Sequence, residues 1–176
     1  LTVSMFCATS PAQMRAQLTH TNKASALASP GWGPVGYVDR DNVYFRCGAL
    51  ELDTGLNFPM LKKLTAKVPV VKAMCGDDGA LLEMVLEKET DAIIVEGFGR
   101  GNLPGGMMPA IKKAVKKGIF VVISTRASSG RVLDSTVFPG SVAQCLESGC
   151  LLAGETTTAK ARLLLMYVLS QKEAIQ

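Results

Sequence analysis

Hydrophobic positions in the second half of the chain alternate between short continuous runs and longer stretches with helical spacing. Runs with the length of strands lie at 68–74, 92–95, 119–124 and 150–153, and Pro69 indicates that the first is the beginning of a strand or an edge strand. Such runs are typical of parallel strands that are covered on both faces. The stretches with helical spacing lie at 81–86, 107–117, 141–147 and 157–172. This alternation predicts an α/β domain in which helices flank a parallel sheet on both sides, giving three layers.

Two of the predicted helices have contrasting surfaces. The 107–117 helix carries four lysines on one face and apolar residues on the other, which is typical of a helix with one face in solvent. The last helix is apolar on nearly all sides. We therefore expect the last helix to be well buried.

The first 65 residues do not follow the alternation. Residues 2–8 have the pattern of a strand, and Gly36–Arg46 has that of a hairpin turning at Asp41 and Asn42. We place a domain boundary near residue 65: residues 66–176 form the α/β domain, and residues 1–65 are a strand and hairpin from the end of a preceding domain, followed by a linker. Because the chain begins without Met and inside an apparent strand, we expect it to be a fragment of a longer protein.

Composition narrows the class of protein. Apolar residues make up 48% and charged residues 19% of the 176 residues, which suits a globular core and excludes a disordered chain. No apolar run approaches the length of a membrane span, and no signal peptide is evident. The net charge of +4 comes without the aromatic residues typical of a nucleic-acid surface. We expect a cytoplasmic protein that binds neither membrane nor nucleic acid.

The five cysteines and the one histidine give no metal-binding pattern. The cysteines are odd in number and contain no CxxC pair, and His20 lies far from Cys145 and Cys150 in the sequence. We expect buried, reduced thiols and no bound metal.

Two loops follow predicted strands at the edge where ligands bind in parallel sheets. Glu96–Pro104 is rich in glycine but fails the dinucleotide pattern at Asn102, and Thr125–Gly130 combines hydroxyls with an arginine. Each loop is either a tight structural turn or a ligand site. No pairing of a nucleophile with a base is evident, because Cys7 and Cys75 have no basic neighbour in the sequence.

Several segments, in their order and spacing, resemble the L-asparaginase/glutaminase-type amidohydrolase family. They are Ser29–Val38, Ile93–Pro104, Val121–Gly130 and Ala153–Arg162. The resemblance implies a two-domain hydrolase without metal or cofactor, of which this chain is the end of the first domain and the whole second domain. It also implies that the asparagine side-chain amide is hydrolysed to aspartate and ammonia, with glutamine as a possible second substrate.

The same resemblance locates the catalytic groups outside this chain. The family's threonine nucleophile, a second threonine and an aspartate would lie before Leu1, and its lysine position is occupied here by Leu18. A hydroxyl nucleophile is weak unless a neighbouring base or cation activates it, and leucine is neither. No catalytic residue is therefore expected in this chain, and the 176 residues alone should be inactive.

The resemblance also suggests how the second domain takes part. Asn102, with Gly101 and Arg100, would contact the amino-acid substrate of a neighbouring subunit, in a homodimer or tetramer. Some members add a glutamate after the Ser-Gly turn, where this chain offers only Asp134. Two alternatives remain: a catalytically degenerate module for binding or assembly, which Leu18 favours, and an ammonia-releasing tRNA amidotransferase subunit.

Overall fold

The computed structural model describes residues 17–19, 21, 27–28, 36–39, 42–45, 61, 63–134 and 137–174. The chain divides into two compact units, Leu1–Pro59 and Met60–Gln176. The strand predicted over residues 2–8 lies outside the described residues, as do Cys7, His20 and Cys47.

The described residues of the first unit form two antiparallel strand pairs. Strand β1 (Gln17–Leu18) pairs with β2 (Leu27–Ala28), and β3 (Gly36–Asp39) pairs with β4 (Asn42–Phe45). The second pair confirms the predicted hairpin. Its last residue pair is Asp39 with Asn42, so Asn42, which was predicted to lie in the turn, is instead the first residue of β4.

The second unit is built on one parallel sheet, as predicted. Its strands are β5 (Val70–Lys72), β6 (Ala92–Gly97), β7 (Phe120–Thr125) and β8 (Leu151–Leu152), and their order in the sheet is their order in the sequence. All three pairings are parallel. All six residues of β6 are buried, as expected for a continuous apolar run at the centre of a covered sheet.

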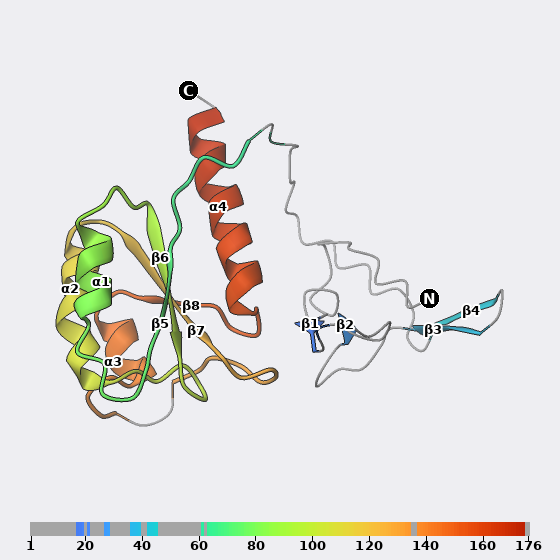
Figure 1. Ribbon diagram of the computed structural model, residues 1–176, viewed down its shortest axis with the longest axis horizontal. Helices are drawn as coiled ribbons and strands as arrows, with labels where there is room; N and C mark the ends of the chain where they lie inside the picture. The colour runs from blue at the N-terminus through green and yellow to red at the C-terminus, as the bar shows by residue number, and fades with distance from the viewer. Residues whose placement is uncertain are drawn as a thin grey trace. The chain divides into compact units, whose positions relative to one another are not determined.

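Helices cover both faces of this sheet, so the predicted three-layer architecture is confirmed (Figure 1). One face packs against α1 (Ala80–Leu86), α2 (Met108–Lys116) and α3 (Val142–Glu147), and the other packs against α4 (Thr158–Ala174). Ile93 and Val95 point toward the three-helix side, whereas Ile94 points toward α4. Successive strand residues therefore supply two separate apolar cores.

Helix α4 is less buried than its composition predicts. Ala161 and Ser170 are buried, but the Leu163 and Val168 side chains are 55% and 43% exposed. The prediction of a well-buried helix is wrong for this outer face, because the sheet can cover only one side of a helix. None of the helices in the described part of the chain is long and apolar enough to cross a membrane.

The lysine face of α2 is confirmed. Ile111 and Ala114 are buried on the inner face of α2, whereas the lysines of the helix are exposed. Lys113 pairs with Glu83 of α1, and Lys117 Nζ donates to the Leu86 carbonyl at 3.0 Å. The lysines therefore partly serve to connect α2 to α1.

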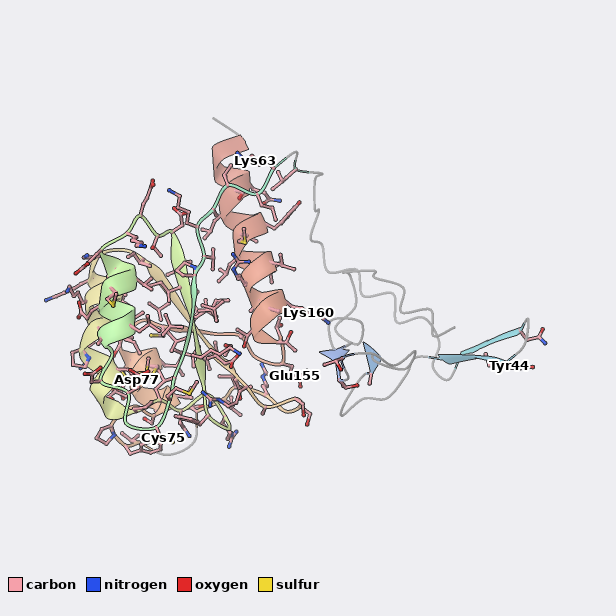
Figure 2. The ribbon with its side chains drawn as sticks, in the orientation of Figure 1. Tyr44, Lys63, Cys75, Asp77, Glu155 and Lys160 are labelled. Atoms are coloured by element: carbon pink, nitrogen blue, oxygen red, sulfur yellow. The ribbon has the colours of Figure 1, made fainter. Side chains whose placement is uncertain are left out.

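The cysteine prediction is confirmed for two residues and wrong for one. Cys145 and Cys150 are buried free thiols, as predicted. Cys75 is exposed, because it follows β5 in a turn beyond the end of the sheet, near Asp77 (Figure 2). Within the described residues, no group of His, Cys, Asp and Glu is arranged to hold a metal ion.

Candidate functional site

The candidate site is the edge of the second unit at which β5, β6 and β7 end. The loop 97–104 leaves β6 there, and the loop 125–131 leaves β7 beside it, since Gly97 and Thr125 are paired in the sheet. Residues Cys75 and Asp77 mark the same edge beyond β5, and Glu155 lies near the start of α4 (Figure 2). The structure thus brings together the two loops that the sequence singles out.

The first loop is a compact turn closed on itself. The Phe98 N–H donates to the Asn102 carbonyl at 2.8 Å, and the Asn102 N–H donates back to the Phe98 carbonyl at 3.0 Å. Gly99 and Gly101 lie within this closed turn and have φ values of +48° and +110°, a region that L side chains rarely adopt. These two glycines permit the turn, which presents Asn102 at its end.

Close packing explains why Gly97 and Gly101 of this loop are glycines. A Cβ on Gly97 would lie 2.6 Å from the carbonyl oxygens of Gly101 and Asn102. A Cβ on Gly101 would lie 2.7 Å from Cγ1 of Val132. Glycine is therefore required at Gly97 by the fold of the loop itself and at Gly101 by the core side chains against which the loop packs.

The second loop holds the first one in place. The Arg126 guanidinium donates to the carbonyls of Ala73 and Gly97, and it lies 4.4 Å from the centre of the Phe98 ring. Thr125 Oγ1 donates to the Gly99 carbonyl at 2.5 Å. The arginine and one of the hydroxyls that made this loop a candidate ligand site are thus engaged with protein atoms, and both hold the first loop in place.

Asn102 is half-buried, and only one of the two polar atoms of its side chain is bonded within the protein. Its Oδ1 accepts a hydrogen bond from the Val142 N–H, the first residue of α3, at 3.3 Å. Among the described residues, no protein atom accepts a hydrogen bond from its Nδ2 group. The carboxamide therefore holds the start of α3 with its oxygen and keeps a pair of donor hydrogens for another acceptor.

The other predicted site residues are placed differently. Gly101 is buried, whereas Arg100 is exposed and its carbonyl accepts from the Leu133 N–H at 3.3 Å. Asp134 is exposed. Leu18 is in β1 of the first unit, opposite Leu27.

A buried carboxylate behind the first loop was missed by the sequence analysis. Glu96, at the end of β6, faces α4, and its side chain is only 10% exposed. Its carboxylate accepts a 2.6 Å bond from Thr158 Oγ1, and Lys72 Nζ lies 3.5 Å away. Ser124 Oγ is 3.0 Å from the same threonine hydroxyl. A charged residue closing an otherwise apolar strand was the available signal, because such a residue needs partners when buried.

The family profile and the related sequences indicate the same family. A profile of the glutaminase/asparaginase C-terminal domain matches residues 67–176. An L-asparaginase from Bacillus licheniformis is 31% identical over 158 residues, covering 89% of this chain and 48% of the relative. A glutamyl-tRNA(Gln) amidotransferase subunit from Thermofilum pendens is 26% identical over 166 residues, covering 91% of this chain and 35% of the relative.

The structural comparison agrees with the sequence comparisons. The crystal structure of a probable cytoplasmic L-asparaginase from Campylobacter jejuni superposes with a TM-score of 0.75 at 26% identity, covering 90% of this chain and 48% of that structure. The chain thus spans about half the length of these asparaginases. The resemblance deduced from the sequence segments is confirmed.

Proposed function

Because this chain belongs to the glutaminase/asparaginase family, with that family's C-terminal domain at residues 67–176, we propose that it is the carboxy-terminal part of an asparaginase-type amidohydrolase. In the proposed reaction, water replaces ammonia at the side-chain amide carbon of asparagine, and aspartate is the other product. The threonine nucleophile and its activating groups belong to the part of the protein that precedes these residues. This chain supplies a substrate contact and requires neither metal nor cofactor.

The observation that carries the proposal is that the Asn102 carboxamide is bonded within the protein through its oxygen and not through its nitrogen. Its oxygen is occupied by the Val142 N–H, so the group available to a ligand is the Nδ2 donor. A donor suits the carboxylate of an amino-acid substrate. Since the Gly97–Asn102 turn is braced by Arg126 and Thr125, the donor is held in a fixed position before substrate arrives.

Arg100 and Gly101 have supporting roles in the proposed site. Arg100 is exposed on the same turn and adds positive charge that attracts a carboxylate. Gly101 is buried and permits the turn to close. We place this turn in the active site of a neighbouring subunit, so that the working protein is a homodimer or tetramer in the cytoplasm.

The test measures ammonia release from asparagine by the full-length protein that carries this chain. Asn102→Asp keeps an oxygen for the Val142 N–H but replaces the donor with a negative charge. We expect it to raise KM about 10- to 100-fold, the loss of one hydrogen bond to a charged group, with a smaller change in kcat. Lys116→Gln, an exposed substitution on α2, serves as the matched control.

Three results would distinguish the alternatives. No ammonia release from a folded full-length protein would overturn the hydrolase proposal. Calorimetric binding of asparagine without turnover would identify a binding or assembly module, as Leu18 suggests. The 176 residues alone should release no ammonia, and turnover by them would place the nucleophile inside this chain.

The amidotransferase alternative is supported by the relatives themselves. Glutamyl-tRNA(Gln) amidotransferase subunits from Thermofilum pendens and Pyrococcus furiosus match this chain, the latter at 31% identity over 107 residues. Ammonia release from glutamine only in the presence of a partner protein and charged tRNA would favour that function. Release from free asparagine without any partner favours the hydrolase.

A further inference from the structure

Two buried thiols that the proposed function does not use meet where α3 ends. Cys145 is in the last turn of α3 and is fully buried, and Cys150 precedes β8 and is 3% exposed. Both are free thiols. Their surroundings are apolar, and the Met108 sulfur lies 3.8 Å from Cys145 Sγ.

The backbone between these cysteines forms the hydrogen-bond pattern of a Schellman motif. The Cys150 N–H donates to the Cys145 carbonyl at 3.0 Å, and the Gly149 N–H donates to the Leu146 carbonyl at 2.9 Å, with Gly149 at φ +92°. The first of these bonds limits the two Cα atoms to a separation of about 7 Å, the outer limit for a disulfide. The motif usually places two apolar side chains in contact at these positions, and here both are cysteines.

A hydrogen bond from Cys150 lowers the pKa of the Cys145 thiol, and the same bond together with burial raises the pKa of Cys150. A monovalent soft metal ion held by two thiolates would leave one net negative charge in a dry site beside the carbonyls that end α3, which is unfavourable. A disulfide is neutral and leaves no such charge.

We propose that Cys145 and Cys150 form an intramolecular disulfide that links the end of α3 to the start of β8 when the protein is oxidised. With a small disulfide such as oxidised glutathione, the Cys145 thiolate attacks one sulfur and releases one glutathione thiolate. Cys150, after losing its proton to water, attacks the mixed disulfide and releases the second. The two protons re-form two glutathione thiols, and the two cysteines supply the two electrons. Because both thiols are buried, exchange proceeds through local opening of this turn.

The sequence around the pair allows a direct test. Trypsin cleaves after Arg131 and Lys160, so residues 132–160 form one peptide that contains both cysteines. The chain is equilibrated with oxidised glutathione, and its remaining thiols are alkylated under denaturing conditions. We expect most molecules to give a peptide without alkyl groups and about 2 Da lighter than its dithiol form. Cleavage after Glu147, between the cysteines, should leave two pieces joined until a reductant is added.

Matched variants make the result specific. Cys75→Ser, which removes the exposed thiol, should leave the link intact, whereas Cys150→Ser should abolish it. The proposal is overturned if Cys145 and Cys150 can both still be alkylated in wild-type protein in which Cys75 has reacted with glutathione. It is also overturned if each of the two carries a separate glutathione. Because the peptide map of the wild-type protein decides the question, the test remains valid even if the Cys150→Ser variant does not fold. The outcome is independent of any amidohydrolase activity.

Discussion

Gly101→Ala should destabilise the second unit substantially more than the neighbouring change Gly99→Ala. Both glycines have positive φ in the same turn, at +110° and +48°. They differ in their surroundings. An added Cβ at Gly101 would meet side-chain carbons of Val132, Ile123 and Val142 at 2.7, 3.1 and 3.2 Å, whereas one at Gly99 would meet nothing within 4 Å.

The expected magnitude follows from these two differences. A non-glycine residue in a sparsely populated backbone region costs about 1–3 kcal/mol, and crowding a packed core costs about 1–3 kcal/mol more. Replacing glycine by alanine also lowers the conformational entropy of the unfolded chain, which offsets about 0.4–1 kcal/mol of this loss of stability. Gly101→Ala should therefore lower the free energy of unfolding by about 1–5.5 kcal/mol, and Gly99→Ala by about 1 kcal/mol, since it carries only the milder backbone strain.

Urea unfolding followed by helical circular dichroism is the suitable assay. All helices in the described residues belong to the second unit, whereas the single tryptophan, Trp32, belongs to the first, so its fluorescence would report the wrong unit. Equal loss of stability in the two variants would refute the packing argument, and it would show that the turn yields to admit a methyl group.

Three further substitutions test individual contacts. Ser141→Ala should cost about 1 kcal/mol in urea unfolding, because Ser141 Oγ caps α3 by accepting from the Gln144 N–H at 3.2 Å; an unchanged midpoint would contradict this role. Thr158→Val should cost about 1–3 kcal/mol by removing a donor from buried Glu96, and Thr158→Ser, which keeps the hydroxyl, should recover most of it. The hydrogen bond and charge of Lys67 lower the pKa of Glu89, so Lys67→Met should raise that pKa in a carboxyl NMR titration. Because the pKa is lowered in the folded protein, the pair's stabilisation is present above the unfolded pKa and is lost as the pH falls through the folded value; a titration curve that Lys67→Met leaves unchanged would show that the pair does not persist in solution.

Some features of the site were predictable because their signals are local. The position of the Gly97–Asn102 turn follows from an apolar strand that ends in glycines, and the helix start at Ser141 follows from a capping residue before an apolar stretch. The backbone hydrogen bond that brings Cys150 next to Cys145 was also locally encoded, by cysteines on either side of a Ser-Gly helix end, but spacing rules for metal sites and disulfide frameworks do not detect it.

Other features depend on which segments meet in space. The hydroxyl of Thr125 and the guanidinium of Arg126 have the chemistry of a ligand site in the sequence, but the pairing of β6 with β7 places them against the carbonyls of the first loop. The buried carboxylate of Glu96 is tolerable because α4 begins beside it with Thr158 and β5 places Lys72 next to it.

The sequence by itself determined the layers of the second unit, because strand and helix periodicities are properties of neighbouring residues and β6 is apolar on both faces. Only the tertiary structure decided how the polar groups at the end of the sheet are used. Hydrogen-bond partners there come from separate strands and helices, so local pattern cannot assign them. The same reason explains α4: its composition indicated burial, but contact with a single sheet face left Leu163 and Val168 exposed.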